Sequence, residues 1–333
     1  MNVAEDLPHP VPPQAFMLWK ENWVWPALDT RARVATLFHI SLRPQLGEGV
    51  FTFKASGEGW KHRYVGRSPI PRQLETFVPV RNERMVFRVE EPGERFFISY
   101  RSEELDADFS YRGRFPTWDF HHGPRMPGES PLGEMGLYVF HFYHQEQGLE
   151  MEGELRFKRG VMAGEHLAVS GYGNRDHSWG WRDDFAFRRH HWICASFPDK
   201  YLQGSCMNET FYPGDKFGGF VSDQAGNIAV AHVDTSSAYW LEPGEPLGPL
   251  DQDVTYQLRT VEGRTYTLTA HISSDYGRHW LNARSDDRSQ VYMDCQIFCD
   301  YTLAETGERG SGVLEVGKHL HGEGVADTVG RPE

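Results

Sequence analysis

The sequence has no excess of basic residues and no long apolar run. Its 333 residues include 34 lysines and arginines against 47 aspartates and glutamates, which gives a net charge of −13. Because phosphate-binding surfaces need clustered lysine and arginine, this balance argues against a nucleic-acid partner. No uninterrupted apolar stretch reaches the length needed to cross a bilayer, so the sequence predicts no stable membrane insertion.

Secretion signals and disulfide frameworks are also missing. Residues 1–13 carry acids and four prolines but no basic region followed by an apolar run, so we expect no secretory signal and a cytoplasmic location. In that compartment the four cysteines, Cys194, Cys206, Cys295 and Cys299, should be free, buried thiols. Cys194 and Cys206 lie equally far from Lys200 in a predicted hairpin, and a reversible disulfide between them stays open as an alternative.

Motifs for common cofactors and nucleophiles are absent as well. No Gly-x-Gly-x-x-Gly or P-loop opens a helix, and no Gly-x-Ser-x-Gly elbow lies in an α/β context. The adjacent histidines 121–122 and 190–191 would point to opposite faces of a strand, which makes chelation by either pair difficult. We therefore expect no cofactor and no metal.

Short strands separated by turn residues fill most of the chain. In residues 149–158, Leu149, Met151, Leu155 and Phe157 alternate with charged residues, which predicts a strand with one buried and one solvated face. Residues 136–144 are predicted as its partner strand, joined by a loop at 145–148. Further strand pairs are expected within residues 217–235, 254–272 and 291–316. The proline-rich residues 1–15 should be disordered or lie along the surface.

These strands are too numerous for one small barrel, and closure into barrels removes exposed sheet edges. The sequence predicts an all-β, predominantly antiparallel protein with two domains, residues 1–185 and 186–333. A ligand site between the two domains is expected, since interdomain clefts often bind ligands.

The most unusual stretch is residues 171–185. It places an acid, an imidazole, guanidinium groups and two indoles in one short segment, predicted as a turn between two strands. Asp176 beside His177, among indole rings, is a suitable setting for proton transfer. The structural alternative is that both side chains hold a sharp turn together, with Arg175 and Arg182 as ion-pair partners, since perturbed acids also occur in structural networks.

Aromatic residues make up 14% of the chain. Many of them should be ordinary barrel core, but ring faces around a cavity can also stabilise a cationic intermediate. Trp179 and Trp181, two residues apart, are the best candidates for such a lining. The stretch that contains Trp118, Asp119 and His121 is a second one.

The stretch Asp176-His177-Ser178-Trp179-Gly180-Trp181-Arg182-Asp183, preceded by Gly171 and Gly173, resembles the carotenoid 1,2-hydratase (hydroxyneurosporene synthase) superfamily. Residues 21–23 and 312–315 resemble it more loosely. The resemblance implies two lipocalin-like (calycin) β-barrel domains packed together, apolar and often isoprenoid ligands, and cofactor-free addition or removal of water at a carbon–carbon double bond. This chain is shorter than the carotenoid enzymes and has a second acid at Asp184, which favours a smaller terpenoid or steroid-like substrate.

We therefore expect a cofactor-independent hydratase or dehydratase, with or without isomerase activity, that acts on a small hydrophobic terpenoid-type substrate as a monomer or homodimer. The expected catalytic residues are Asp176, His177, Arg182 and Asp183. The expected substrate-binding residues are Tyr172, Trp179, Trp181, Trp118, Asp119, His121 and Glu315. The alternatives are a non-catalytic carrier of an apolar lipid or terpenoid, which many lipocalin-like proteins are, and a pericyclase-type enzyme that shapes its substrate.

Overall fold

The computed structural model describes residues 6–13, 19–120, 143–181, 187–209, 215–234, 251–281, 283–284 and 289–321. Its regular elements are antiparallel strands and two short 3-10 helices, so the all-β prediction is confirmed. The chain forms two compact units, Met1–Arg182 (unit 1) and Asp183–Glu333 (unit 2). The part of the chain that is described contains no helix with the length and apolarity to span a membrane.

One sheet forms unit 1, in the order β4-β3-β2-β1-β11-β10-β8-β7-β6-β5, with β9 beside β10. Its strands are β1 (Trp19–Asp29), β2 (Val34–Arg43), β3 (Glu48–Gly57), β4 (Trp60–Pro69), β5 (Val80–Arg81), β6 (Met85–Glu91), β7 (Arg95–Arg101), β8 (Leu105–Gly113), β9 (Trp118–Asp119), β10 (Tyr143–Phe157) and β11 (His166–Trp181). The short helices η3 (Pro44–Leu46) and η4 (Leu74–Thr76) lie between strands.

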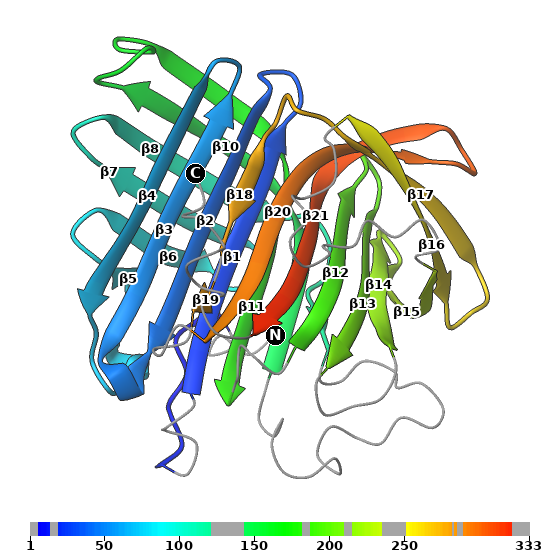
Figure 1. Cartoon of the computed structure of the whole chain (residues 1–333), viewed down its shortest axis with the longest axis horizontal. Helices are drawn as coiled ribbons and strands as arrows, with labels where there is room; N and C mark the ends of the chain where they lie inside the picture. Colours follow the sequence, from blue (N-terminus) through cyan, green and yellow to red (C-terminus); the bar gives the residue numbers. More distant parts are fainter. Residues whose placement is uncertain are drawn as a thin grey trace. The chain divides into compact units, whose positions relative to one another are not determined.

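The sheet of unit 1 folds over on itself, so that β1 to β4 form one layer and β5 to β8 another (Figure 1). Aromatic contacts join the two layers: Phe38 of β2 lies 5.5 Å from Phe109 of β8, and Phe53 of β3 lies 4.8 Å from Tyr100 of β7, between ring centroids. The apolar core lies between these layers because alternate residues of each strand point inward. No hydrogen-bonded pairing joins the end strands β4 and β5 within the described residues.

Unit 2 contains a closed sheet. Its strands are β12 (Phe187–Ser196), β13 (Tyr201–Glu209), β14 (Asp215–Asp223), β15 (Gly226–Asp234), β16 (Gln252–Thr260), β17 (Thr265–Ile272), β18 (Arg278–Trp280), β19 (Ala283–Arg284), β20 (Gln290–Leu303) and β21 (Glu308–His321). Pairing of β17 with β20 closes the ring, which runs β17-β16-β15-β14-β13-β12-β21-β20. Inward residues such as Ile193, Leu268 and Leu314 fill the barrel.

Several local predictions agree with these strands. In β10 the four apolar positions of the predicted alternation, Leu149, Met151, Leu155 and Phe157, are all buried. The pairs β14–β15, β16–β17 and β20–β21 confirm the three predicted strand pairs. The cysteines are free and buried as predicted. Cys194 is opposite Gln203 and Cys206 is opposite His191, so these two thiols do not face each other across the hairpin.

Two predictions are wrong, and a third holds only in part. Residues 145–148 belong to the continuous strand β10 and form no loop. In the described part of the amino-terminal segment, residues 6–13, Pro10 and Pro13 are exposed as expected of a surface segment, but Asp6 and Pro8 are buried. The central stretch up to Trp181 lies inside β11 and forms no turn.

Glycines explain how β11 reaches this position beside β1. A Cβ atom at Gly171 would collide with the backbone of Leu28, and one at Gly173 with the backbone of Pro26. The Gly-rich start of the central stretch therefore allows a close approach of two strands, and it places the polar residues that follow against β1.

Candidate active site

Side chains of β11 alternate between the two faces of the sheet. Arg175, His177 and Trp179 point to the inner face of unit 1, where His177 is opposite Trp23 of β1. Asp176 points to the other face. The structure therefore does not bring Asp176 and His177 together, and each has partners of its own.

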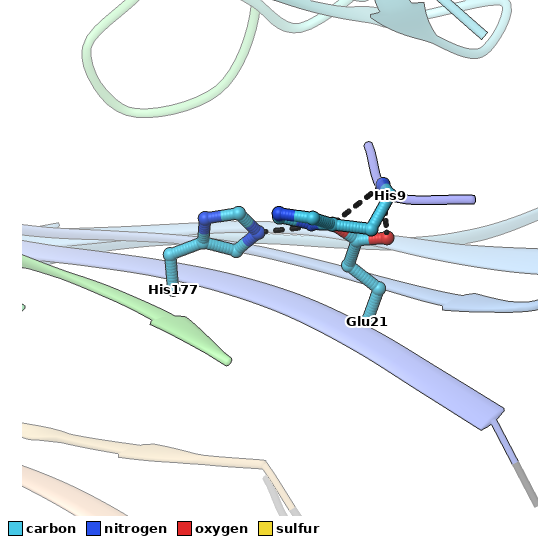
Figure 2. A group of neighbouring side chains, drawn as sticks. All are labelled: His9, Glu21 and His177. Carbon is cyan, nitrogen blue, oxygen red and sulfur yellow. Dashed lines mark hydrogen bonds and ion pairs between the residues drawn. The ribbon is translucent and has the colours of Figure 1, made fainter. Parts of the chain in front are cut away.

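On the inner face, the Glu21 carboxylate lies between two imidazoles (Figure 2). Glu21 Oε1 is 3.0 Å from His177 Nε2 and 2.8 Å from His9 Nδ1, and the His9 backbone N–H donates to Glu21 Oε2 at 3.0 Å. Indoles enclose the cluster: Trp23 stacks on His177 at 4.5 Å and Trp179 stacks on His9 at 4.0 Å, between ring centroids. We call these three residues, His9, Glu21 and His177, the inner cluster.

Burial sets the protonation states in the inner cluster. Burial alone would raise the pKa of Glu21, but the hydrogen bonds from His177 and His9 outweigh it and lower that pKa below its ordinary value. Burial also lowers the pKa of His177, and the bond to Glu21 only partly opposes this. The favoured state is thus a neutral His177 that donates its Nε2–H to an ionised Glu21.

The inner face also fixes the amino-terminal segment. Arg175 pairs with Asp6, and both side chains are buried. Arg175 Nε donates to Gln147 Oε1 at 2.9 Å, and its second terminal nitrogen donates to Thr117 at 2.9 Å. The backbone N–H of Gly93 donates to Asp6 at 2.5 Å. Asp6 thus ties the amino-terminal segment to β11 and to the turn at Gly93.

On the opposite face, Asp176 belongs to a second group of side chains. Asp176 Oδ2 is 2.9 Å from His144 Nε2. In the register of β10 and β11, Asp176 is directly opposite Glu146, a fully buried carboxylate that accepts a 3.3 Å hydrogen bond from Asn174. The ring of Phe120 stacks on His144 at 4.7 Å. We call Asp176, His144 and Glu146 the outer cluster.

Accessibility separates the two clusters. The side chain of Asp176 is 23% exposed and that of His144 is 11% exposed, whereas Glu21 and His177 are both 0% exposed. A proton donor must touch its substrate. Asp176, an acid of the outer cluster, is partly exposed, whereas Glu21, the acid of the inner cluster, is fully buried, and only His9 of the inner cluster is partly exposed, at 14%.

The other predicted site residues are distributed over both units. Trp118 is opposite Glu146 and packs edge-on against Phe120, so it belongs beside the outer cluster, whereas Asp119 is opposite Gln145. Tyr172 lies under the guanidinium of Arg114, 4.1 Å from the ring centroid. The predicted residues His121, Arg182 and Asp183 lie outside the described residues, as does the side chain of Trp181.

Glu315 is in unit 2 and has a cluster of its own. Its Oε1 lies 2.7 Å from His190 Nε2, and its Oε2 accepts a hydrogen bond from Gln296. His190, Asp294 and Glu315 offer three ligand atoms within 4.8 Å of one another, as do the residues of the inner cluster. Both groups have the donor types of a metal site.

Sequence reasoning missed four residues of the two clusters in unit 1: His9, Glu21, His144 and Glu146. One signal was present for Glu21, which follows Trp19 and precedes Trp23 and Trp25 on the apolar face of an alternating strand. An acid at such a position needs a buried partner. His144 and Glu146 gave no comparable signal because their contacts depend on strand register.

Three solved structures are similar to this chain. Kievitone hydratase from Nectria haematococca matches with 13% identity and a TM-score of 0.59, over 95% of this chain and 92% of that chain. A putative AttH from Nitrosomonas europaea matches with 14% identity and a TM-score of 0.53, over 92% and 97%. CghA, solved with Sch210972, matches with 10% identity and a TM-score of 0.55, over 95% of both chains.

At these identities the likeness shows the fold, which is the lipocalin-like, two-unit fold that the resemblance predicted. No curated protein matches the sequence. Over residues 2–320 the chain matches the model of a domain of unknown function, DUF7064, and it belongs to that family.

Proposed function

We propose that this protein is a cofactor-independent hydratase or dehydratase that acts on a small hydrophobic, terpenoid-type alkene or tertiary alcohol. The observation that supports this most directly is the pair of Asp176 and His144, 2.9 Å apart and half-buried, with Glu146 opposite Asp176. Such a pair can hold a carboxyl proton and exchange it with a neighbouring imidazole. Two of the fold neighbours support the proposal: one is called a hydratase, and another was solved with a small molecule, Sch210972.

In the hydration direction, the proton of the Asp176 carboxyl group would pass to one alkene carbon, and the π electrons would form the new C–H bond. The positive charge would remain on the more substituted carbon, where the ring faces of Trp118 and Phe120 could stabilise it. A water molecule would then add to that carbon, and its surplus proton would return to Asp176 directly or through His144. Atoms and charge balance, since the net change is the addition of one water. Dehydration is the reverse.

An Asp176→Asn variant tests the proposal. General acid–base catalysis typically contributes about 10²- to 10⁴-fold, so turnover should fall by that factor while the melting temperature and circular dichroism spectrum stay like those of the wild type. The assay incubates the protein with myrcene, a terpenoid alkene, or linalool, a tertiary terpenoid alcohol, in ¹⁸O-labelled water and follows label uptake by mass spectrometry. The exposed Asp253, changed to Asn, is the matched control and should keep full turnover.

Two outcomes would overturn the proposal in different ways. Tight binding of the terpenoids by the wild type, with no exchange of labelled water, would indicate a carrier. Conversion that survives Asp176→Asn but is lost in Trp118→Ala would indicate an enzyme that only shapes its substrate. Unfolding of Asp176→Asn would give this aspartate the structural role considered above, and His144→Gln would then separate folding from activity.

A further inference from the structure

We propose that His190, Asp294 and Glu315 of unit 2 form a binding site for a divalent transition-metal ion, with Zn²⁺ as the preferred ion. Their ligand atoms lie within 4.8 Å of one another. None of these residues takes part in the reaction proposed for Asp176. The metal site therefore stands or fails independently of that reaction.

Register brings the three side chains to one face of adjacent strands. Across β12, β21 and β20, His190 is opposite Gly317 and Gly317 is opposite Asp294. In the neighbouring row of the same face, Glu315 of β21 is opposite Gln296. Side chains two residues apart on a strand share a face, so an ion between the three ligand atoms could contact ligands from three strands at once.

Gly317 keeps the space for this arrangement open. A Cβ atom at this position would collide with the ring of His190 and with the Tyr292 hydroxyl group. Gly317 also separates His190 from Asp294 in the row, and its missing side chain leaves room for the His190 ring and the Tyr292 hydroxyl group above it. The close approach of the His190 ring and the Tyr292 hydroxyl group explains the glycine at this position, and no positive φ is involved.

Outer contacts hold two of the ligands in a suitable orientation. His190 Nδ1 is hydrogen-bonded to the Tyr292 hydroxyl group, and its Nε2 faces Glu315. Gln296 donates to the other carboxylate oxygen of Glu315. Metal-binding histidines almost always have a hydrogen-bond partner on the ring nitrogen that does not bind the metal.

In the inner cluster of unit 1, the second ring nitrogen of His177 lacks such a hydrogen-bond partner within the described residues. His177 Nε2 bonds Glu21, but its Nδ1 is buried without a hydrogen-bond partner in the described structure. Both histidines of that cluster bond the same carboxylate oxygen, Glu21 Oε1, which already explains its geometry without an ion. We therefore assign the metal to unit 2.

The donor set selects the class of ion. One imidazole with two carboxylates carries two negative charges when the histidine is neutral, which favours a divalent cation. Zn²⁺ accepts histidine nitrogen and carboxylate oxygen at about 2.0–2.2 Å and commonly keeps one further position for water. Ca²⁺ prefers six or more oxygen ligands, so it should bind much more weakly. The bound ion would connect β12, β20 and β21.

Titration of the metal-free full-length protein with ZnCl₂ in a calorimeter tests the site, with metal content measured after dialysis. We expect one Zn²⁺ per chain and a higher melting temperature with Zn²⁺. Glu315→Gln and Asp294→Asn should each weaken binding more than tenfold and remove the rise in melting temperature, while circular dichroism reports that each variant is folded. His271→Asn is the matched control, because His271 forms an exposed pair with Asp253 in the same unit. It should bind Zn²⁺ like the wild type.

The proposal fails if the folded wild type binds no Zn²⁺, or if both Glu315→Gln and Asp294→Asn keep wild-type affinity. It also fails if binding is lost in His177→Gln, because the ion would then belong to the inner cluster. Asp176→Asn should bind Zn²⁺ normally. That result separates the metal site from the proposed hydration.

Discussion

Asp176 and His177 are neighbours in sequence, yet each interacts with residues from other parts of the chain. His177 bonds Glu21 of β1 on the inner face, and Asp176 lies 2.9 Å from His144 of β10 on the outer face. One strand thus supplies a buried acid–imidazole pair and a partly exposed one. The partly exposed pair is the one used in the proposed reaction, and the buried pair fixes the amino-terminal segment through the contacts of Glu21 with His9.

The inner cluster should make the protein sensitive to acid. The pKa values of His177 and Glu21 are both lowered in the folded protein, from ordinary values of 6.5 and 4.5. The unfolded chain therefore binds protons that the folded protein does not, and stability is lost as pH falls below about 6.5 and further below about 4.5. One such proton changes the free energy of unfolding by at most about 1.4 kcal/mol per pH unit.

Urea unfolding at about pH 7 and pH 5 measures this loss. The His177→Gln variant keeps an N–H donor toward Glu21 but cannot titrate, so its free energy of unfolding should fall less between these two pH values than that of the wild type. Equal pH dependence in His177→Gln and the wild type would contradict the assigned protonation states.

Single residues were predictable where their own chemistry was unusual. Asp176 was selected as a candidate because an acid beside an imidazole and indoles is rare, and Glu21 could have been selected as an acid on an otherwise apolar strand face. The partners His144 and Glu146 could not be found in the same way. Their place beside Asp176 follows from the pairing of β10 with β11, which no local pattern specifies.

At the scale of elements, most strands were predictable because alternation is a local signal. The central stretch was misread for a physical reason: glycine, charge and polarity usually indicate a turn. In β11 they have other causes. The glycines permit close packing against β1, and the charged groups find buried partners such as Asp6 and Glu21 on neighbouring segments.

The amino-terminal segment, residues 6–13, should contribute strongly to the stability of unit 1. Arg175 is 1% exposed and its partner Asp6 is 0% exposed. Asp6→Asn leaves the buried guanidinium without its counter-charge, and breaking a buried pair from one side typically costs about 3–5 kcal/mol. Urea unfolding should show a loss of that size in the free energy of unfolding.

An exposed pair provides the comparison. Arg95 and Glu91 are more than half exposed, at 56% and 54%, and pairs in such surroundings contribute about 0–1 kcal/mol. Glu91→Gln should therefore change the free energy of unfolding by less than about 1 kcal/mol. If Asp6→Asn had an equally small effect, the amino-terminal segment would not be held in the way that its contacts indicate.

At the scale of the whole molecule, the sequence predicted two β units but not how their sheets end. Hairpins such as β16–β17 follow from alternation around a short turn. The β17–β20 pairing that closes unit 2, and the β1–β11 pairing that joins the two ends of unit 1, connect segments far apart in the chain. Such pairings depend on the entire set of strands, so no local window reveals them.

The different sheet ends should be visible in hydrogen exchange. In unit 2, β17 is bonded to β16 on one side and to β20 on the other, so nearly all amides of residues 268–272 should exchange slowly.

In unit 1, β4 pairs with β3, and the described residues provide no strand on its other side. About every second amide of β4 points away from β3 and should exchange quickly. Exposed Lys61, Arg63 and Arg67 and the final Pro69 are typical of an edge that resists further pairing. Residue-resolved exchange by NMR checks this, and uniformly slow exchange along β4 would mean that another segment covers the edge.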